Sequence, residues 1–290
     1  MDETLPVLSE LELPDLDADL DDSNLAAQLV RTAGQLAYQM RAQGLQGQRK
    51  TTVSDVVTAA DQAAEEYIVA QLTRVRPDDG ILGEEGAARA SRSGRSWVID
   101  PVDGTYNFLS GLSYWCSAIA LRRDVASTGA KTADPEVILG AVYQIQEDKL
   151  WLGGEALAAT LNGRPISVAA AEDSTASGEI GALGQISAAT YLHPSWLAAP
   201  DAREPWLAAA QKLATIRMLG SGSCDLSRVA QGELGCWFQH STAEWDWLPG
   251  KAIVRAAGGA TETLEVRGLR WFLAGSALAV AELSAALRGG

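Results

Sequence analysis

The stretch SWVIDPVDGTYNF, residues 96–108, carries the strongest structural signal in this chain of 290 residues. Its first part, Ser96 to Ile99, is mostly apolar and contains two β-branched residues, as expected of a buried strand. Turn residues then break the run, so Asp100 and Asp103 are expected just past the strand end. Pro101 fixes its own backbone and biases Asp100 toward an extended conformation, which would hold both carboxylates toward one divalent cation.

The same motif also fits an ordinary surface turn with two solvated acids. Taken alone, an Asp-Pro-x-Asp-Gly pattern favours that simpler interpretation. Gly104 and Thr105 point to the alternative, because their backbone N–H groups at a helix start could hold a phosphate oxygen. The rest of the chain decides between a plain turn and a metal and phosphate site.

The composition is that of an ordinary soluble globular protein, with 47% hydrophobic and 21% charged residues. A chain of 290 residues can form one large domain or two coupled halves. No apolar run reaches the roughly 18 residues that a membrane span needs, and the N-terminus lacks a signal-peptide pattern. We therefore expect a cytoplasmic protein that has no membrane partner.

Cysteine and histidine patterns typical of metal sites are missing from the sequence. The three cysteines have no metal-finger spacing and are expected to be reduced core residues without disulfides. His193 and His240 are the only histidines, which argues against a histidine-rich metal site. Any bound metal is therefore expected to have oxygen ligands.

The net charge of −14 is distributed unevenly. Nine acidic residues precede Arg31, the first basic residue. Residues 1–23 are therefore expected to form a disordered or loosely docked acidic arm. The acidic balance argues against a nucleic-acid duplex as a partner.

Helical and strand patterns alternate along the chain. Apolar residues that recur every three or four positions predict helices at residues 24–42, 58–74, 206–213, 224–231 and 244–257. Pro249 is tolerable only in the first turn of the last of these. Apolar and β-branched runs predict strands at 80–83, 96–99, 114–121, 137–144, 150–152, near Ile180, at 217–219 and at 237–239. Such alternation suggests layered α/β or α+β architecture.

Acids at four separate places fit a family pattern. The string WVIDPVDGTYNF at residues 97–108 closely resembles the metal-binding signature of the inositol monophosphatase family, magnesium-dependent and lithium-sensitive sugar phosphatases. Other segments of the chain resemble further signatures of that family, in the same order. They are Lys50 with DVVTAAD at 55–61, GEE at 83–85, WD at 245–246, IV at 253–254 and AGG at 257–259. The resemblance covers roughly residues 24–285.

The resemblance implies an α+β fold with layered αβαβα architecture and a homodimer. Its N-terminal half, residues 24–170, would carry most metal ligands, and its C-terminal half, residues 171–290, would complete the site and the substrate pocket. The small, polar segment at 169–177 is expected to join the two halves.

The resemblance also assigns roles to individual residues. Glu84, Asp100 and the backbone carbonyl of Val102 would hold the first Mg²⁺, whereas Asp100, Asp103 and Asp246 would hold the second. Glu84 would also face a weaker third Mg²⁺, so that the site takes two to three ions. Hard carboxylate and carbonyl oxygens suit this cation.

The remaining catalytic roles implied by the resemblance concern water and phosphate. Asp61 and the Thr105 hydroxyl would orient the attacking water and help to deprotonate it. The backbone amides of Gly104 and Thr105 would bind the phosphate. Asp246 would lie near the leaving oxygen, and Asp103 would lie beside the substrate.

The expected substrate is the phosphate ester of a small polyol, with inositol 1-phosphate as the first candidate. Where inositol-cleaving members present a glutamate to the ring hydroxyls, this chain has Gln239, which loses charge-assisted strength. The small residues Gly220, Ser221 and Gly222 line the same pocket in the family and leave room for another alcohol.

Several alternatives stay open at this point. Related enzymes act on histidinol phosphate, fructose 1,6-bisphosphate and 3′-phosphoadenosine nucleotides. A nucleotide would require basic or aromatic groups near residues 220–223, where only Arg217 and Arg228 are close in sequence. An alternative of another class is a non-catalytic relative that binds metal or a phosphate ligand for regulation, with the acidic arm contacting a partner.

Overall fold

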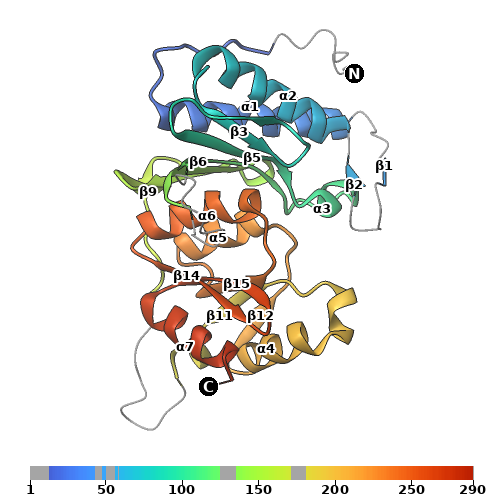
Figure 1. Ribbon diagram of the computed structural model, residues 1–290, viewed down its shortest axis with the longest axis vertical. Coiled ribbons are helices and arrows are strands. Elements are labelled where there is room, and N and C mark those ends of the chain that lie inside the picture. Colours follow the sequence, from blue (N-terminus) through green and yellow to red (C-terminus); the bar gives the residue numbers. More distant parts are fainter. Residues whose placement is uncertain are drawn as a thin grey trace.

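The computed structural model describes residues 13–42, 48–49, 56–57, 59–124, 135–170 and 181–289. Helices and two β-sheets alternate in five layers (Figure 1). The outer helices of the N-terminal half are α1 (Asp22–Ala42) and α2 (Ala59–Val75). Between the sheets lie α5 (Gly222–Ala230) and α6 (Glu244–Ala256), and α4 (Pro200–Ala210) and α7 (Ala277–Leu287) cover the far side. The α+β class and the layered αβαβα architecture are confirmed.

The larger sheet has eight strands in the order β10-β9-β8-β7-β6-β5-β3-β4. All neighbouring pairs are antiparallel except β3 and β5, which run parallel. Its strands are β3 (Gly80–Gly83), β4 (Ala88–Arg89), β5 (Arg95–Asp103), β6 (Cys116–Arg123), β7 (Val137–Gln144), β8 (Lys149–Gly154), β9 (Leu157–Leu161) and β10 (Arg164–Pro165). The pair β1 (Gln48–Arg49) and β2 (Val56–Val57) forms a separate antiparallel ribbon.

The strand β5 runs further than its sequence predicts. It continues to Asp103, so the prediction that the strand ends at Ile99 and that both acids follow it is wrong. The pairing of β5 with β6 shifts register between Asp100 and Asp103, because Pro101 has no N–H to donate and a bulge takes up the irregularity. The Ser117 hydroxyl donates to the Pro101 carbonyl at 2.6 Å. The two acids are therefore held by the end of a central strand.

The smaller sheet has five strands in the order β12-β11-β13-β15-β14. Its members are β11 (Ser187–Thr190), β12 (Thr215–Arg217), β13 (Cys236–His240), β14 (Ala260–Val266) and β15 (Leu269–Gly275). The strand β11 is parallel to both β12 and β13, whereas β15 is antiparallel to β13 and β14. The strand expected near Ile180 forms instead as β11; Ile180 itself lies outside the described residues.

Short helical segments connect these elements. They are α3 (Thr105–Leu109) and the 3₁₀ turns η2 (Ile145–Glu147), η4 (Ala182–Gln185) and η5 (Pro194–Ala198). No helix in the described part of the chain is long and apolar enough to cross a membrane.

Three apolar clusters hold the layers together. One packs α1 and α2 on the larger sheet, the second fills the space between the two sheets, and the third joins the smaller sheet to α4 and α7. In the middle cluster, the rings of Trp237 on β13 and Trp247 on α6 stack with centroids 5.6 Å apart. This contact fixes the start of α6, which carries Asp246.

The helix α6 lies unusually close to the larger sheet. A Cβ atom at Gly140 of β7 would come within 2.2 Å of the Pro249 carbonyl oxygen, so only glycine fits at this crossing. Pro249 lies in the second turn of α6, so the prediction that this proline lies in the first turn of the helix is wrong. The helix loses the hydrogen bond that a residue at this position would donate, but packing on both sheets retains it.

The described part of the acidic arm, residues 13–21, lies against α2. Leu16 is buried, and its N–H donates to the Gln71 side chain at 3.0 Å. The Tyr67 hydroxyl donates to the Pro14 carbonyl at 3.1 Å. The disorder expected of residues 1–23 therefore does not extend over this segment, because an apolar residue within it anchors it to the first core cluster.

Candidate active site

Three acids from separate elements meet between the two sheets. Carboxylate oxygens of Asp100, Asp103 and Asp246 all lie within 4.8 Å of one another. The first two are buried at the end of β5, and the third lies in the first turn of α6. The structure thus brings together the acids that were predicted to share the second metal.

Glu84 approaches this trio from β3. Because β3 runs parallel to β5, the residue after β3 comes beside the end of β5, and the Glu84 N–H donates to the Ile99 carbonyl at 3.2 Å. Burial and then Asp246 raise the pKa of Glu84 to about 8, while a hydrogen bond with the Asp100 carboxyl acts in the opposite direction. Glu84 therefore adjoins the trio without belonging to the 4.8 Å group.

The electrostatics of this acid cluster favour a bound cation. Burial, followed by the charges of Glu84 and Asp103, raises the pKa of Asp100 well above its ordinary value. Burial and then Asp103 raise the pKa of Asp246 to about 7. Asp100 Oδ1 is buried, and no donor among the described residues reaches it. An all-oxygen cluster with an orphaned carboxylate oxygen fits a hard divalent metal, which would offset the repulsion.

Backbone groups of α5 hold Asp103 in place. The N–H groups of Gly222 and Ser223 donate to the Asp103 carboxylate at 3.2 and 2.5 Å. Both lie in the first turn of α5, where unpaired N–H groups and the helix dipole favour an anion. Ser221 caps this helix, since its hydroxyl accepts from the Cys224 N–H at 3.3 Å. Two residues predicted to line the substrate pocket, Ser221 and Gly222, thus form the helix start that fixes a predicted metal ligand.

Asp61 and Thr105 lie on two sides of the acid cluster. Asp61 is buried in the first turn of α2, close enough to Glu84 to contribute to the raised pKa of that carboxyl. The Thr105 hydroxyl donates to the Val102 carbonyl at 3.1 Å, which joins a predicted water-orienting group to a predicted metal ligand. Lys50 and the first part of the 55–61 signature lie outside the described residues.

Two glycine-containing loops meet at the phosphate side of the site. Gly104 and Gly220 have φ values of 98° and 88°. A Cβ at Gly104 would come 3.0 Å from the Gly220 carbonyl oxygen, so both loops depend on glycine. The Asn107 amide nitrogen ties the loops together, donating at 2.7 Å to the carbonyls of Tyr114 and Leu219.

These loops open into a cavity of about 750 Å³. Its walls include every residue predicted to contact substrate: Asp103, Gly104, Thr105, Gly220, Ser221, Gly222, Gln239 and Asp246. Asp61, Glu84, Asp100 and Val102 are not part of this lining. The cavity therefore joins the acid cluster to the position of Gln239.

Several residues around the site were not identified from the sequence. Glu65 on α2 accepts from the Glu85 and Ala87 N–H groups, both at 2.9 Å, and so holds the turn that carries Glu84. Its position four residues after Asp61, on one face of a predicted helix, is a cue that could have indicated it. Asp225 lines the cavity and accepts from the Tyr114 hydroxyl at 2.6 Å. Burial raises its pKa well above the ordinary value.

The cavity is also lined by aromatic residues that no motif indicated. Tyr106 follows Thr105 directly, but Tyr191 and His193 come from the segment after β11. They are distant in sequence from residues 220–223, the segment near which a nucleotide substrate would require basic or aromatic groups. The two basic residues near that segment, Arg217 and Arg228, are not part of the lining.

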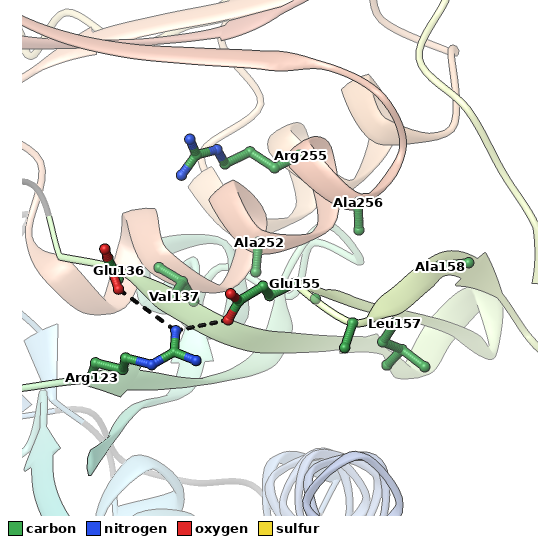
Figure 2. Close-up of a pocket in the computed structure, with 11 residues that line it drawn as sticks. Arg123, Glu136, Val137, Glu155, Leu157, Ala158, Ala252, Arg255 and Ala256 are labelled. Carbon is green, nitrogen blue, oxygen red and sulfur yellow. Dashed lines mark hydrogen bonds and ion pairs between the residues drawn. The ribbon is translucent and has the colours of Figure 1, made fainter. Parts of the chain in front are cut away.

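A second cavity of about 750 Å³ lies between β7, β8 and α6 (Figure 2). Arg123 lies between Glu136 and Glu155 there, at 3.7 and 2.7 Å. Arg255 projects into the same space from α6. Within the described residues, only one group of three side chains could hold a metal, and two of its members, Asp103 and Asp246, line the first cavity. The first cavity is therefore the candidate active site.

Comparison with known proteins agrees with this geometry. The chain is 33% identical over 206 residues to the Nus factor SuhB of Xylella fastidiosa, covering 71% of this chain and 68% of that one. It is 32% identical over 210 residues to an inositol-1-monophosphatase of Rhizobium meliloti, covering 71% of each. The solved structure of the suhB protein from Bartonella henselae matches with a TM-score of 0.75 and 25% identity, covering 92% of this chain and 98% of that one.

The model of the inositol monophosphatase family matches residues 21–287, almost the whole described chain. This match and the relatives above 30% identity agree with the resemblance first seen in residues 96–108. The chain belongs to the inositol monophosphatase family, whose members are phosphatases.

Proposed function

We propose that this protein is a Mg²⁺-dependent phosphomonoesterase that hydrolyses a small polyol phosphate, with inositol 1-phosphate as the first candidate. The observation that carries the proposal is the acid trio, whose carboxylate oxygens lie within 4.8 Å of one another and two of whose members, Asp103 and Asp246, line a cavity with glycine-containing loops. Members of the family are metal-dependent phosphatases that act on small phosphorylated substrates, and the all-oxygen donor set suits Mg²⁺.

The acids divide between two metal positions in this proposal. Glu84, Asp100 and the Val102 carbonyl would hold one ion, Asp100, Asp103 and Asp246 a second, and Glu84 would face a third. Bound Mg²⁺ would neutralise charge on the phosphate and lower the pKa of the attacking water. Burial raises the pKa of Asp103, whereas the N–H bonds from Ser223 and Gly222 lower it and would orient the carboxylate for this role.

Protons and phosphate are handled by side chains and backbone around the cluster. Asp61 and the Thr105 hydroxyl would orient the water and receive its proton, and Glu84 would support them. The start of α3 would present the Gly104 and Thr105 amides to the phosphate, since the first N–H groups of a helix have no acceptor within it. Asp246 would lie beside the leaving oxygen.

Inositol 1-phosphate leads because a relative from Rhizobium meliloti is named an inositol-1-monophosphatase. Gln239 lines the cavity and could donate or accept a hydrogen bond with a ring hydroxyl, but without a carboxylate charge. Histidinol phosphate, fructose 1,6-bisphosphate and 3′-phosphoadenosine nucleotides remain the competing esters.

A second candidate is a non-catalytic regulatory protein. It is favoured by the relative named Nus factor SuhB, a name that is not that of a phosphatase. Against it, all six groups proposed for the chemistry are retained here: Asp61, Glu84, Asp100, Asp103, Thr105 and Asp246. Phosphate release by the purified chain separates the two candidates.

A cytoplasmic location and a homodimer complete the proposal. The homodimer comes from the family resemblance, and the location is the one expected from the sequence. Sedimentation equilibrium of the full chain tests the dimer, and fractionation of the source cells tests the location.

The decisive experiment measures phosphate release from a panel of phosphomonoesters with Mg²⁺, in the presence and absence of Li⁺. The native chain is expected to hydrolyse at least one ester, to need Mg²⁺ and to be inhibited by Li⁺. Asp100→Asn is expected to lower turnover by at least about a thousandfold, because it removes a charge shared by both ion positions. Asp201→Asn, an exposed acid at the start of α4, is the matched control and should retain full activity.

Two outcomes would contradict the proposal. In one, no ester of the panel is hydrolysed under any metal condition. In the other, Asp100→Asn is as active as the native chain, which would place the chemistry elsewhere.

A further inference from the structure

The turn that carries Glu84 is held from outside by a buried acid of α2. Residues 84–87 connect β3 to β4, and two of their four N–H groups donate to backbone carbonyls. The other two, those of Glu85 and Ala87, donate to separate carboxylate oxygens of Glu65, each at 2.9 Å. One side chain of α2 therefore provides the acceptors for half of the N–H groups in this turn.

The Glu65 carboxylate fits closely against the end of β3. Glu65 is only 4% exposed. A Cβ atom at Gly83 would come 2.3 Å from Glu65 Oε2, and its three nearest atoms would all belong to the Glu65 carboxyl group. Hydrogen bonds from N–H groups to a carboxylate are charge-assisted, and exclusion of water strengthens them. The contact between Glu65 and the turn is therefore both tight and strong.

The helix α2 brings a second acid to the same place. Asp61 and Glu65 are one helical turn apart, so they lie on the same face of α2. Asp61 is also buried, and its charge contributes to the raised pKa of Glu84. Ile68 and Leu72 of the same helix are buried in the first apolar cluster, which anchors α2 to the larger sheet. One anchored helix thus sets the positions of Asp61 and of the turn that carries Glu84.

We propose that Glu65 is a positioning residue for the proposed metal site, which fixes the turn in the conformation that presents the Glu84 carboxylate to Mg²⁺. Glu65 is not part of the cavity lining, so it acts through Glu84 and not on the substrate. On a turn without its two hydrogen bonds, ion binding would have to order the backbone, and the entropy cost would weaken that binding. The inference rests on the proposed function, which supplies the ion.

Calorimetric titration of Mg²⁺ into the full chain tests this role in the absence of substrate. Glu65→Ala should raise the Kd for Mg²⁺ by about 10–100-fold, the usual effect of losing a group that orients a metal ligand. Glu65→Gln keeps one of the two acceptor oxygens and should give a Kd between those of the alanine variant and the native chain. Glu66→Gln, at the exposed neighbouring position of α2, is the matched control and should leave the Kd unchanged.

Phosphate release at increasing Mg²⁺ separates positioning from a general loss of stability. In Glu65→Gln the Mg²⁺ concentration for half-maximal activity should rise by the same factor as the Kd. At saturating Mg²⁺ the kcat should return to within about threefold of the native value, because Glu65 does not contact the substrate. Val75→Ala removes packing at the other end of α2 without touching the turn, so it should leave the half-maximal concentration unchanged.

Gly83→Ala disturbs the same contact from the other side and removes no acid. Its methyl group fits only if the Glu65 carboxyl moves, so this variant should weaken Mg²⁺ binding about as much as Glu65→Gln does. In the Glu65→Ala background the obstacle is gone, and the same glycine substitution should change the Kd by less than about twofold. If Glu65→Ala does not fold, the cycle is completed with Glu65→Gln, in which a smaller coupling of the same sign is expected.

Two results would overturn the positioning role in a native chain that binds Mg²⁺ and hydrolyses an ester. One is a Kd in the Glu65 variants within about twofold of the native value. The other is additivity of the Gly83 and Glu65 substitutions, which would show that the two residues do not act through one contact. If the native chain neither binds Mg²⁺ nor releases phosphate, the proposed function itself fails, and this inference fails with it.

Discussion

The acid cluster and the two exposed tyrosines of the adjoining cavity, Tyr106 and Tyr191, are built in opposite ways. Asp100 and Asp103 are buried, end a central strand and are fixed by backbone groups of β6 and α5. Tyr106 and Tyr191 are exposed, and they come from α3 and from the segment after β11, which are far apart in sequence. Substitution of the buried acids should therefore disturb the fold, whereas substitution of the exposed tyrosines should be tolerated.

The sharpest test of this contrast is Asp103→Asn, which changes the acid cluster alone. The amide leaves one oxygen to face two N–H donors of α5 and removes a charge from the trio. We expect kcat/KM to fall by at least about a thousandfold for every ester, with no change in the ratio between esters. A uniform loss measured by phosphate release confirms that Asp103 belongs to the chemistry. A loss restricted to one substrate would move it to the specificity side.

Gly220→Ala should destabilise the contact between the loops that contain Gly104 and Gly220. At φ 88° an alanine is strained, and its Cβ would lie 2.9 Å from the Asn107 amide nitrogen, which two hydrogen bonds hold in place. We expect the free energy of unfolding to fall by about 2–4 kcal/mol, measured by chemical denaturation.

A matched control separates the two causes. Gly258→Ala has nearly the same φ, 80°, but its Cβ would meet nothing within 4 Å. It should cost only the backbone part, about 1–2 kcal/mol. Equal losses in the two variants would show that the contact between the two loops contributes nothing to stability.

The contrast also explains what the sequence could and could not predict. Glu84 directly follows the apolar strand β3, and Asp100 and Asp103 come at the end of the apolar strand β5, so one sequence is enough to show these local patterns. Helices α1 and α2 were predicted within two residues of their ends, because each shows a clear apolar face. Tyr191 and His193 have no such pattern, since their place in the cavity wall depends on where β11 ends relative to α3.

Tertiary packing accounts for the local errors. A turn was expected after Ile99, but pairing with β6 extends the strand through Pro101 to Asp103. Pro249 was expected in the first turn of α6, but contacts with β7 hold the helix together around it. In both cases a proline signal was overridden by burial between two layers.

Without metal, the acid cluster should make stability depend on pH. Folding raises the pKa of Glu84 to about 8 and that of Asp246 to about 7, from 4.5 and 3.8. The folded state therefore holds more protons than the unfolded state between these limits, and stability must fall as pH rises. With EDTA we expect the free energy of unfolding to fall by roughly 1–3 kcal/mol from about pH 5 to about pH 8.5.

Saturating Mg²⁺ should remove this slope, because the cation replaces the protons that the cluster otherwise retains. Glu84→Gln should flatten the EDTA curve, and Glu136→Gln, an acid of the second cavity, should leave it unchanged. Denaturation curves at several pH values provide the measurement. Identical slopes with EDTA and with Mg²⁺ would show that the cluster does not bind the ion.

The smallest expected effect concerns Gln239, which lines the cavity but does not belong to the acid trio. Gln239→Glu introduces a carboxylate that accepts from ring hydroxyls with charge-assisted strength, but it also adds a negative charge to a cavity that already contains Asp246. These terms oppose each other, so we expect turnover of inositol 1-phosphate relative to benzyl phosphate to rise by only about threefold. Gln211→Glu at the exposed end of α4 controls for net charge. If the ratio stays constant, Gln239 plays no part in specificity.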